Sequence, residues 1–131
     1  MKEVRYPTIN EIIEINKNIL QEIKVRKADR SALIFSGKKT LEDIIKDMKN
    51  KKGDLFDKAV VLLKGIIKNH PFESGNRRTA LVATASFLGV NNEKLNITHD
   101  INIFQGIRES YYAGDEIKNW LKGGEIRAFK R

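Results

Sequence analysis

The 131-residue sequence contains no cysteine and only two histidines. Without cysteine, disulfide frameworks, thiolate zinc sites and cysteine nucleophiles are excluded. Two histidines are too few for an all-histidine catalytic zinc site. No apolar run approaches the roughly 20 residues that a membrane-spanning helix needs, and the charged N-terminus leads into no apolar segment typical of a secretory signal. We therefore expect a cytoplasmic protein without a membrane partner.

The composition is that of one folded domain. Hydrophobic residues make up 40% of the chain and charged residues 32%, which is enough apolar material for a single core over residues 1–131. Lys and Arg total 25 against 17 Asp and Glu, a net charge of +8. Such a chain suggests an anionic partner, such as nucleic acid, a nucleotide or an acidic protein, although a solvated lysine-rich surface has the same composition.

Apolar residues at helical spacing begin close to the N-terminus. Thr8 and Glu11 have the spacing of a capping box, and the apolar pattern that follows predicts a helix over about residues 8–24. Residues 25–39 are different, because they combine charged residues with a short β-prone apolar stretch. We expect a loop or small hairpin there.

Three more helices are predicted in the middle of the chain. Thr40 is the expected cap of a second helix, and Asp54 opens a third one with a wide apolar stripe. The third helix should end near Pro71, because proline disfavours helix in the residue before it. Residues 77–88 are apolar or small on nearly every side, which predicts a buried central helix.

The C-terminal part predicts two shorter helices. Thr98 or Asp100 is the expected cap of a fifth helix, and Asp115 of a sixth. No set of strands long enough for a sheet remains. The predicted fold class is therefore all-α, a compact bundle of about six helices with a small loop or hairpin.

The segment from His70 to Ala80 departs from ordinary packing logic. Arg77 and Arg78 stand in the first turn of a predicted helix, where the helix dipole prefers carboxylates. This placement makes sense if an anion such as phosphate binds the N–H groups of the helix start. Gly75 would let the backbone approach a ligand closely, and Asn76 would add a neutral donor. His70 would supply a base that titrates near neutrality.

Each of these residues also has an ordinary interpretation. A histidine before a proline usually ends a helix, Gly-Asn is usually a turn, and paired arginines are usually solvated. On spacing alone, an anion site and an ordinary helix–turn–helix connection therefore both remain open.

The pattern His70-x-Phe72-x-x-Gly75-Asn76-x-Arg78 resembles the signature of the Fic/Doc (Fido) superfamily and is closest to its Doc (death-on-curing) branch. The Doc branch is also matched, outside this pattern, at Thr79, Ala80, Leu81, Phe87, Leu88 and 54–56. The resemblance covers most of the chain and implies a small helical bundle. Fic enzymes transfer AMP from ATP to a protein hydroxyl, whereas Doc enzymes transfer the γ-phosphate.

The resemblance implies a role for each motif residue. His70 would be the general base toward a Ser or Thr hydroxyl of a target protein, and Phe72 would anchor the loop in the core. The residues implied in binding the phosphates of ATP are Gly75, Asn76, Arg77 and Arg78. A flap over residues 31–39 would dock the target chain by β-augmentation, with Leu33, Ile34 and Phe35.

The resemblance also implies partners. The target would be a protein such as a translation factor, an antitoxin would restrain the toxin, and nucleic acid is not required.

Three positions depart from the Fic pattern. Arg77 replaces a glycine and keeps the charge of the Doc lysine, which favours phosphoryl over AMP transfer, and Leu81 again matches Doc. Ser74 occupies the acidic position that holds Mg²⁺, with Glu73 one residue early. A hydroxyl is a poor Mg²⁺ ligand. The alternative is therefore a degenerate Fido domain that binds a nucleotide or a partner without catalysis.

Overall fold

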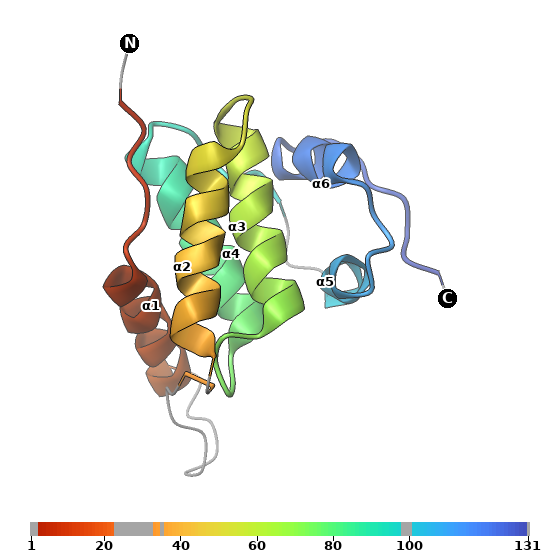
Figure 1. Ribbon diagram of the computed structural model, residues 1–131. Coiled ribbons are helices and arrows are strands. Elements are labelled where there is room, and N and C mark those ends of the chain that lie inside the picture. The colour runs from red at the N-terminus through yellow and green to blue at the C-terminus, as the bar shows by residue number, and fades with distance from the viewer. Residues whose placement is uncertain (1–2, 23–32, 35, 98–100, 131) are drawn as a thin grey trace.

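The computed structural model describes residues 3–22, 33–34, 36–97 and 101–130. Within these ranges it contains six helices and no strand apart from one isolated β-bridge (Figure 1). The helices are α1 (Ile9–Glu22), α2 (Gly37–Asn50), α3 (Leu55–Asn69), α4 (Asn76–Val90), α5 (Ile101–Arg108) and α6 (Gly114–Leu121). The predicted all-α fold is therefore confirmed. No described helix is long and apolar enough to cross a membrane.

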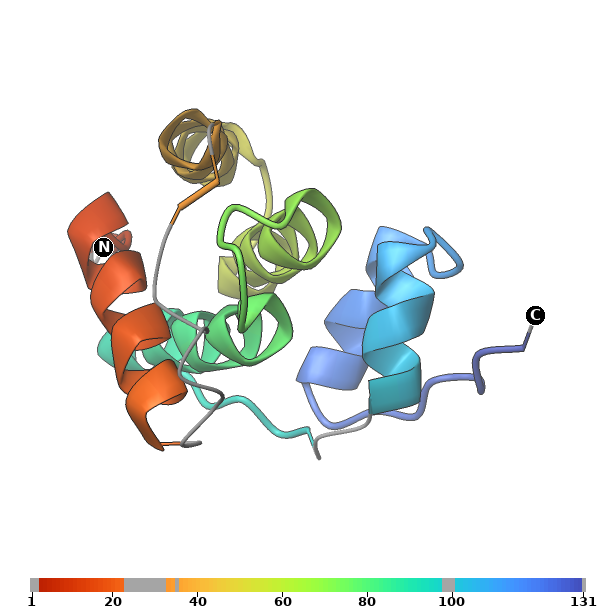
Figure 2. The ribbon, with the colours of Figure 1, turned by 90° about the horizontal axis from the view of Figure 1, so that it is seen from below.

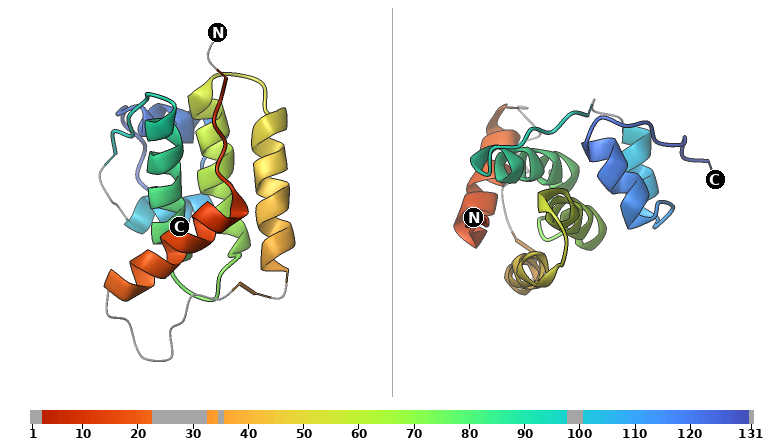
Figure 3. Two further views of the ribbon diagram at one scale, coloured as in Figure 1. Left: turned by 90° about the vertical axis from the view of Figure 1, so that its left-hand side faces the viewer. Right: turned by 90° about the horizontal axis from the view of Figure 1, so that it is seen from above.

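Helix α3 lies at the centre of the bundle and packs against α2, α4, α5 and α6. Helix α1 lies on one side of the α3–α4 pair, and α5 and α6 lie on the other (Figures 2 and 3). Helix α3 contributes five side chains without exposed surface to the core: Ala59, Leu62, Leu63, Ile66 and Ile67. Because α3 contacts nearly every other helix, its two ends have fixed positions in the molecule.

The N-terminal end of α3 is fixed by a capping box, as Asp54 predicted. The Asp54 carboxylate accepts the N–H groups of Phe56 and Asp57 at 2.9 and 3.1 Å, and the Asp57 carboxylate accepts the Asp54 N–H at 2.8 Å. Lys118 of α6 donates to the same Asp57 carboxylate at 3.0 Å. The other end of α3 stops at His70, whose backbone adopts the left-handed conformation (φ 45°).

Helix α2 begins at Gly37, so the predicted start at Thr40 is wrong and the predicted loop over residues 25–39 ends too late. The Thr40 N–H instead donates to the Ser36 carbonyl at 2.9 Å. Gly37 packs so closely that a Cβ there would lie 2.3 Å from the Pro71 carbonyl oxygen. Packing onto a distant loop therefore sets this helix start, and a local capping signal does not reveal it. Much of the predicted loop lies outside the described residues.

The prediction that the helix over residues 77–88 is buried on all sides is also wrong. One stripe of α4 is exposed and consists of Arg78, Val82, Ser86 and Val90. Val82 and Val90 are 42% and 51% exposed, whereas Ala80, Ala83 and Phe87 on the other side are buried. The apolar composition of α4 gave the wrong prediction because two valines of this helix face solvent. Helix α3 takes the central position instead.

The two C-terminal helices form as predicted, although their starts differ. The expected caps of α5, Thr98 and Asp100, lie outside the described residues. The cap predicted at Asp115 is wrong, because α6 begins at Gly114. The side chain that satisfies this helix start is Glu116, whose carboxylate accepts the Ala113 N–H at 3.0 Å.

A buried asparagine joins α1 to the connection between α3 and α4. Asn16 has no exposed surface, and its amide donates to the Ser74 carbonyl at 2.9 Å and to the Thr79 hydroxyl at 3.0 Å. A buried amide without these partners would be costly. Asn16 therefore fixes both the loop before α4 and the first turn of α4 against α1.

We predict that Asn16→Ala lowers the free energy of unfolding by about 1–3 kcal/mol, because it leaves buried polar groups without partners. Urea unfolding followed by circular dichroism measures this. Thr79→Val is the matched second variant, since it removes the hydroxyl and keeps the shape. The double variant should cost less than the sum of the single ones. Strictly additive costs would show that the two side chains do not interact.

Candidate active site

Two residues in the left-handed conformation mark the ends of the loop between α3 and α4. His70 (φ 45°, ψ 65°) still donates its N–H to the Ile66 carbonyl at 3.1 Å, and Pro71 then stops the helix. Gly75 (φ 79°) precedes α4, and a Cβ there would lie 3.1 Å from the Asn16 amide nitrogen. The glycine is thus explained by its backbone conformation and its contact with α1, rather than by the close approach of a ligand alone.

The interior of the loop is closed by Asn76. Its side-chain oxygen accepts the Phe72 N–H at 3.0 Å, and its amide donates to the Phe72 carbonyl at 2.8 Å. Phe72 is 2% exposed and Asn76 is 7% exposed, so the pair is buried. The Asn76 side chain therefore shapes the loop, and its backbone N–H belongs to the first turn of α4.

The predicted flap lies next to this loop. Leu33 forms an isolated antiparallel bridge with Phe72, and the Ile34 N–H donates to the Pro71 carbonyl at 3.0 Å. Phe35 lies outside the described residues. Two of the three predicted flap residues are thus placed beside the motif, while their role in docking a target stays a prediction.

A cavity of about 350 Å³ opens at the loop. Its lining residues are His70, Glu73, Ser74, Gly75, Asn76, Arg77, Arg78 and Arg108. The structure therefore brings together the seven predicted residues from the loop and the start of α4, and Phe72 lies buried close by. Arg108, from the last turn of α5, was not predicted.

The surroundings of the His70 side chain favour its neutral form. Its Nε2 atom is buried and has no hydrogen-bond partner among the described residues. Burial lowers the pKa of the His70 imidazole, and the charges of Arg108 and Arg77 lower it further. A neutral imidazole with a free lone pair can accept a proton at neutral pH.

The cavity also has the features of an anion site. The first bond of α4 runs from the Thr79 N–H to the Gly75 carbonyl at 2.9 Å, so the preceding three N–H groups stand at the open, positive end of the helix. Three arginines line the cavity against one carboxylate, that of Glu73. This imbalance suits a ligand that carries several negative charges.

Helix α5 contributes the residues that sequence analysis missed. The Arg77 guanidinium donates to the Gln105 side-chain oxygen, and the Gln105 amide donates to Glu109 at 2.8 Å. Arg108 follows Gln105 by three residues, which places the two on neighbouring positions of the helix surface. Both lie about thirty residues beyond the motif in sequence, and no local pattern connects them to it.

The acidic residues of the cavity determine which metal ion it could bind. The described residues contain no group of three His, Cys, Asp or Glu side chains suited to a metal. Mg²⁺ usually binds one or two carboxylates together with substrate phosphates and waters. Glu73, with the Ser74 hydroxyl beside it, fits Mg²⁺ only when the ion shares the phosphates of a bound nucleotide.

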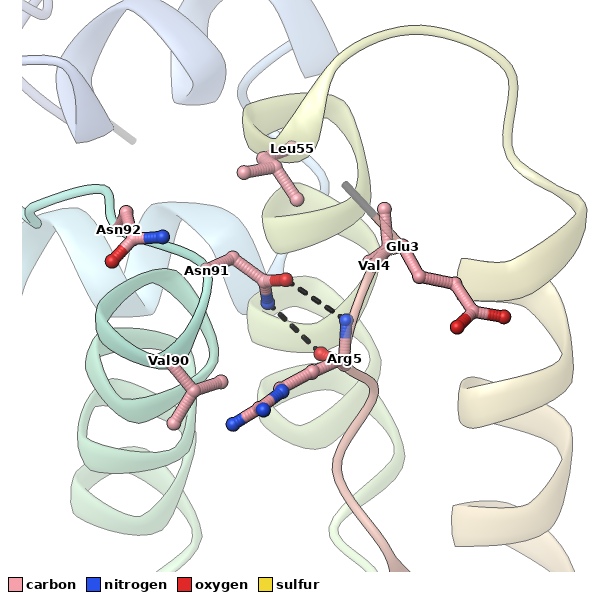
Figure 4. Close-up of a pocket in the computed structure, with 7 residues that line it drawn as sticks. All are labelled: Glu3, Val4, Arg5, Leu55, Val90, Asn91 and Asn92. Atoms are coloured by element: carbon pink, nitrogen blue, oxygen red, sulfur yellow. Dashed lines mark hydrogen bonds between the residues drawn. The ribbon is translucent and has the colours of Figure 1, made fainter. Parts of the chain in front are cut away.

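A larger cavity of about 660 Å³ lies at the opposite end of α4 (Figure 4). It is lined by Glu3, Val4, Arg5, Leu55, Val90, Asn91 and Asn92. The Asn91 side chain is occupied there, because it accepts the Arg5 N–H at 2.8 Å and donates to the Arg5 carbonyl at 2.9 Å. None of the lining side chains is a histidine or a hydroxyl. This cavity lies between the N-terminal segment and the bundle, and it contains none of the motif residues.

Comparison with known proteins agrees with the motif. The Toxin Doc of Mycolicibacterium smegmatis (strain ATCC 700084 / mc(2)155) is 40% identical over 48 residues, which is 37% of this chain and 37% of that protein. This match therefore spans little more than a third of the relative's length. The sequence model of the Fic/DOC family matches residues 6–88, which include α1, α2, α3, most of α4 and the whole loop around His70. The chain belongs to the Fic/DOC family.

Proposed function

We propose that this protein is a Doc-like toxin that transfers the γ-phosphoryl group of ATP to a Ser or Thr hydroxyl of a target protein. The observation that carries the proposal is that His70, whose buried Nε2 has no hydrogen-bond partner among the described residues, lines the same small cavity as the start of α4 and three arginines. The similarity to a Doc toxin supports the same reading. A toxin of this kind would be held inactive by an antitoxin partner.

Different residues of the cavity would bind different parts of ATP. The N–H groups at the start of α4 would bind phosphate oxygens, and Arg77 and Arg78 would neutralise their charge. Glu73 would hold Mg²⁺ together with the phosphates. When bound, Mg²⁺ supplies additional charge neutralisation to the phosphates.

The transfer step uses His70 as the base. The hydroxyl oxygen of the target attacks the γ-phosphorus, and a new O–P bond forms while the bond from that phosphorus to the β–γ bridging oxygen breaks. The hydroxyl proton passes to Nε2 of His70, and ADP leaves with the electron pair of the broken bond. The products are a phosphorylated protein, ADP and the protonated imidazole, which then returns its proton to solvent.

Arg77 favours phosphoryl over AMP transfer. Its half-buried guanidinium is held by Gln105 at the position where Fic proteins have a glycine. The terminal phosphate is the most charged part of ATP and is the group such a cation attracts most. AMP transfer would place the less charged α-phosphate there instead.

The proposal is tested with purified translation factors, Mg²⁺ and ATP labelled on the α- or the γ-phosphate. We expect label in protein from γ-labelled ATP only. His70→Ala should lower the transfer rate by roughly 10²–10⁴-fold and leave ATP affinity, measured by calorimetry, nearly unchanged.

Each other outcome has a distinct meaning. Label from α-labelled ATP would identify the protein as an AMP transferase. ATP binding without transfer to any factor would favour a binding module, and His70→Ala with full activity would remove His70 from the mechanism.

The pKa of His70 can be measured directly, because the chain has only two histidines. We expect its imidazole to titrate below the usual value of about 6.5, since burial and the nearby Arg108 and Arg77 disfavour its charged form. It should thus be protonated only as the pH falls below that value. Arg108→Gln removes one of the positive charges that lower this pKa and should therefore raise the midpoint.

Proton NMR of the imidazole, assigned with His70→Ala, gives the midpoint. A midpoint at or above the usual value would contradict this account of the site.

Ser74 offers a gain-of-function test. Its side chain lines the cavity at the position where family members carry an acidic residue. Ser74→Asp should restore a carboxylate ligand and raise the transfer rate at limiting Mg²⁺ concentration. Ser74→Asn is the matched control, with the same shape and no charge. Equal rates for the wild type and Ser74→Asp over a Mg²⁺ titration would show that residue 74 does not bind the ion.

A further inference from the structure

We infer that Arg108, at the end of α5, forms with Arg77 a phosphate subsite that recognises the terminal phosphate of the bound nucleotide. The inference rests on the proposed function, because it assigns a further residue to the same site. It makes Arg108 a specificity-determining residue that distinguishes ATP from ADP.

Position is the first argument. Arg108 lines the cavity together with His70 and Arg77, although it comes from a different helix and lies thirty residues from Arg78. Its charge lowers the pKa of the His70 imidazole, as that of Arg77 does. Arg108 is therefore close to the group that would receive the proton during transfer.

Rigidity is the second argument. Phe104 and Ile107 of α5 are buried in the core, and Gln105 of the same helix accepts a hydrogen bond from Arg77. Helix α5 is thus attached both to the core and to the first turn of α4. A side chain on such an element is held in place more precisely than one on a loop.

Charge is the third argument. Among the described residues, Arg108 forms no ion pair, and the adjacent Glu109 carboxylate accepts a hydrogen bond from Gln105 instead. Arg77 stands at the start of α4, where the helix dipole disfavours a cation, and Arg108 brings a second positive charge to the same cavity. An anion between them offsets these charges, and the γ-phosphate is the most highly charged group that the site would bind.

The residues that line the cavity then bind different phosphates. The N–H groups of α4 and Arg78 bind phosphates that ATP and ADP share, whereas Arg77 and Arg108 bind the phosphate that ATP alone has. This arrangement places the γ-phosphorus next to His70. It also lets ADP leave once that phosphate has been transferred.

The test compares ATP with ADP, each with Mg²⁺, by calorimetry. Arg108→Gln should weaken ATP binding by about tenfold to a hundredfold, the range for a lost charged hydrogen bond, and ADP binding by less than about threefold. Arg108→Lys, which keeps the charge but not the planar fork, should lie between. Arg78→Gln should weaken both nucleotides alike. Lys94→Gln, an exposed residue beyond the other end of α4, is the matched control for net charge and should change neither.

The outcomes separate this inference from the proposed function. If the wild type binds ATP and transfers phosphate, but Arg108→Gln weakens ATP and ADP equally or not at all, only the role of Arg108 is overturned. If the wild type binds neither nucleotide, the proposed function and this inference both fail.

Discussion

The paired hydrogen bonds between the Asn76 side chain and the Phe72 backbone are the constraint on which the rest of the site depends. Each such bond contributes only about 0.5–1.5 kcal/mol net, but its loss would leave buried groups unsatisfied at about 1–3 kcal/mol. The pair therefore holds the loop in one shape. That shape brings the end of α3, with His70, beside the start of α4, with its free N–H groups.

The charges around the loop between α3 and α4 are unfavourable for one another. Arg77 and Arg78 stand at the positive end of α4, and burial together with the charges of Arg108 and Arg77 lowers the pKa of the His70 imidazole beside them. A site that is unfavourable alone and favourable with a multiply charged anion is what ligand binding selects for.

Sequence predicted what is encoded locally. The Thr8 hydroxyl accepts the Glu11 N–H at the start of α1, and Asp54 begins α3 with a full capping box. In both cases the donors and acceptors lie within three residues of one another. The motif likewise predicted that His70 and the start of α4 flank one loop, because these residues are close together in sequence.

Contacts between distant segments were not predictable in this way. Asn16 was hidden in the apolar pattern of α1, Arg108 follows the motif by thirty residues, and the start of α2 is set by the contact between Gly37 and Pro71. In each case the deciding partner is far away in sequence, so no local pattern carries the signal.

The unusual residue at position 74 affects chemistry and fold separately. The loop is held there through the Ser74 backbone carbonyl, which accepts the Asn16 amide at 2.9 Å, and not through the side chain. The loop, the helix start and the position of His70 therefore do not require a carboxylate at this position. What a carboxylate would add is a ligand for Mg²⁺. The residue at position 74 can therefore change the chemistry of the cavity without changing the shape of the loop that forms it.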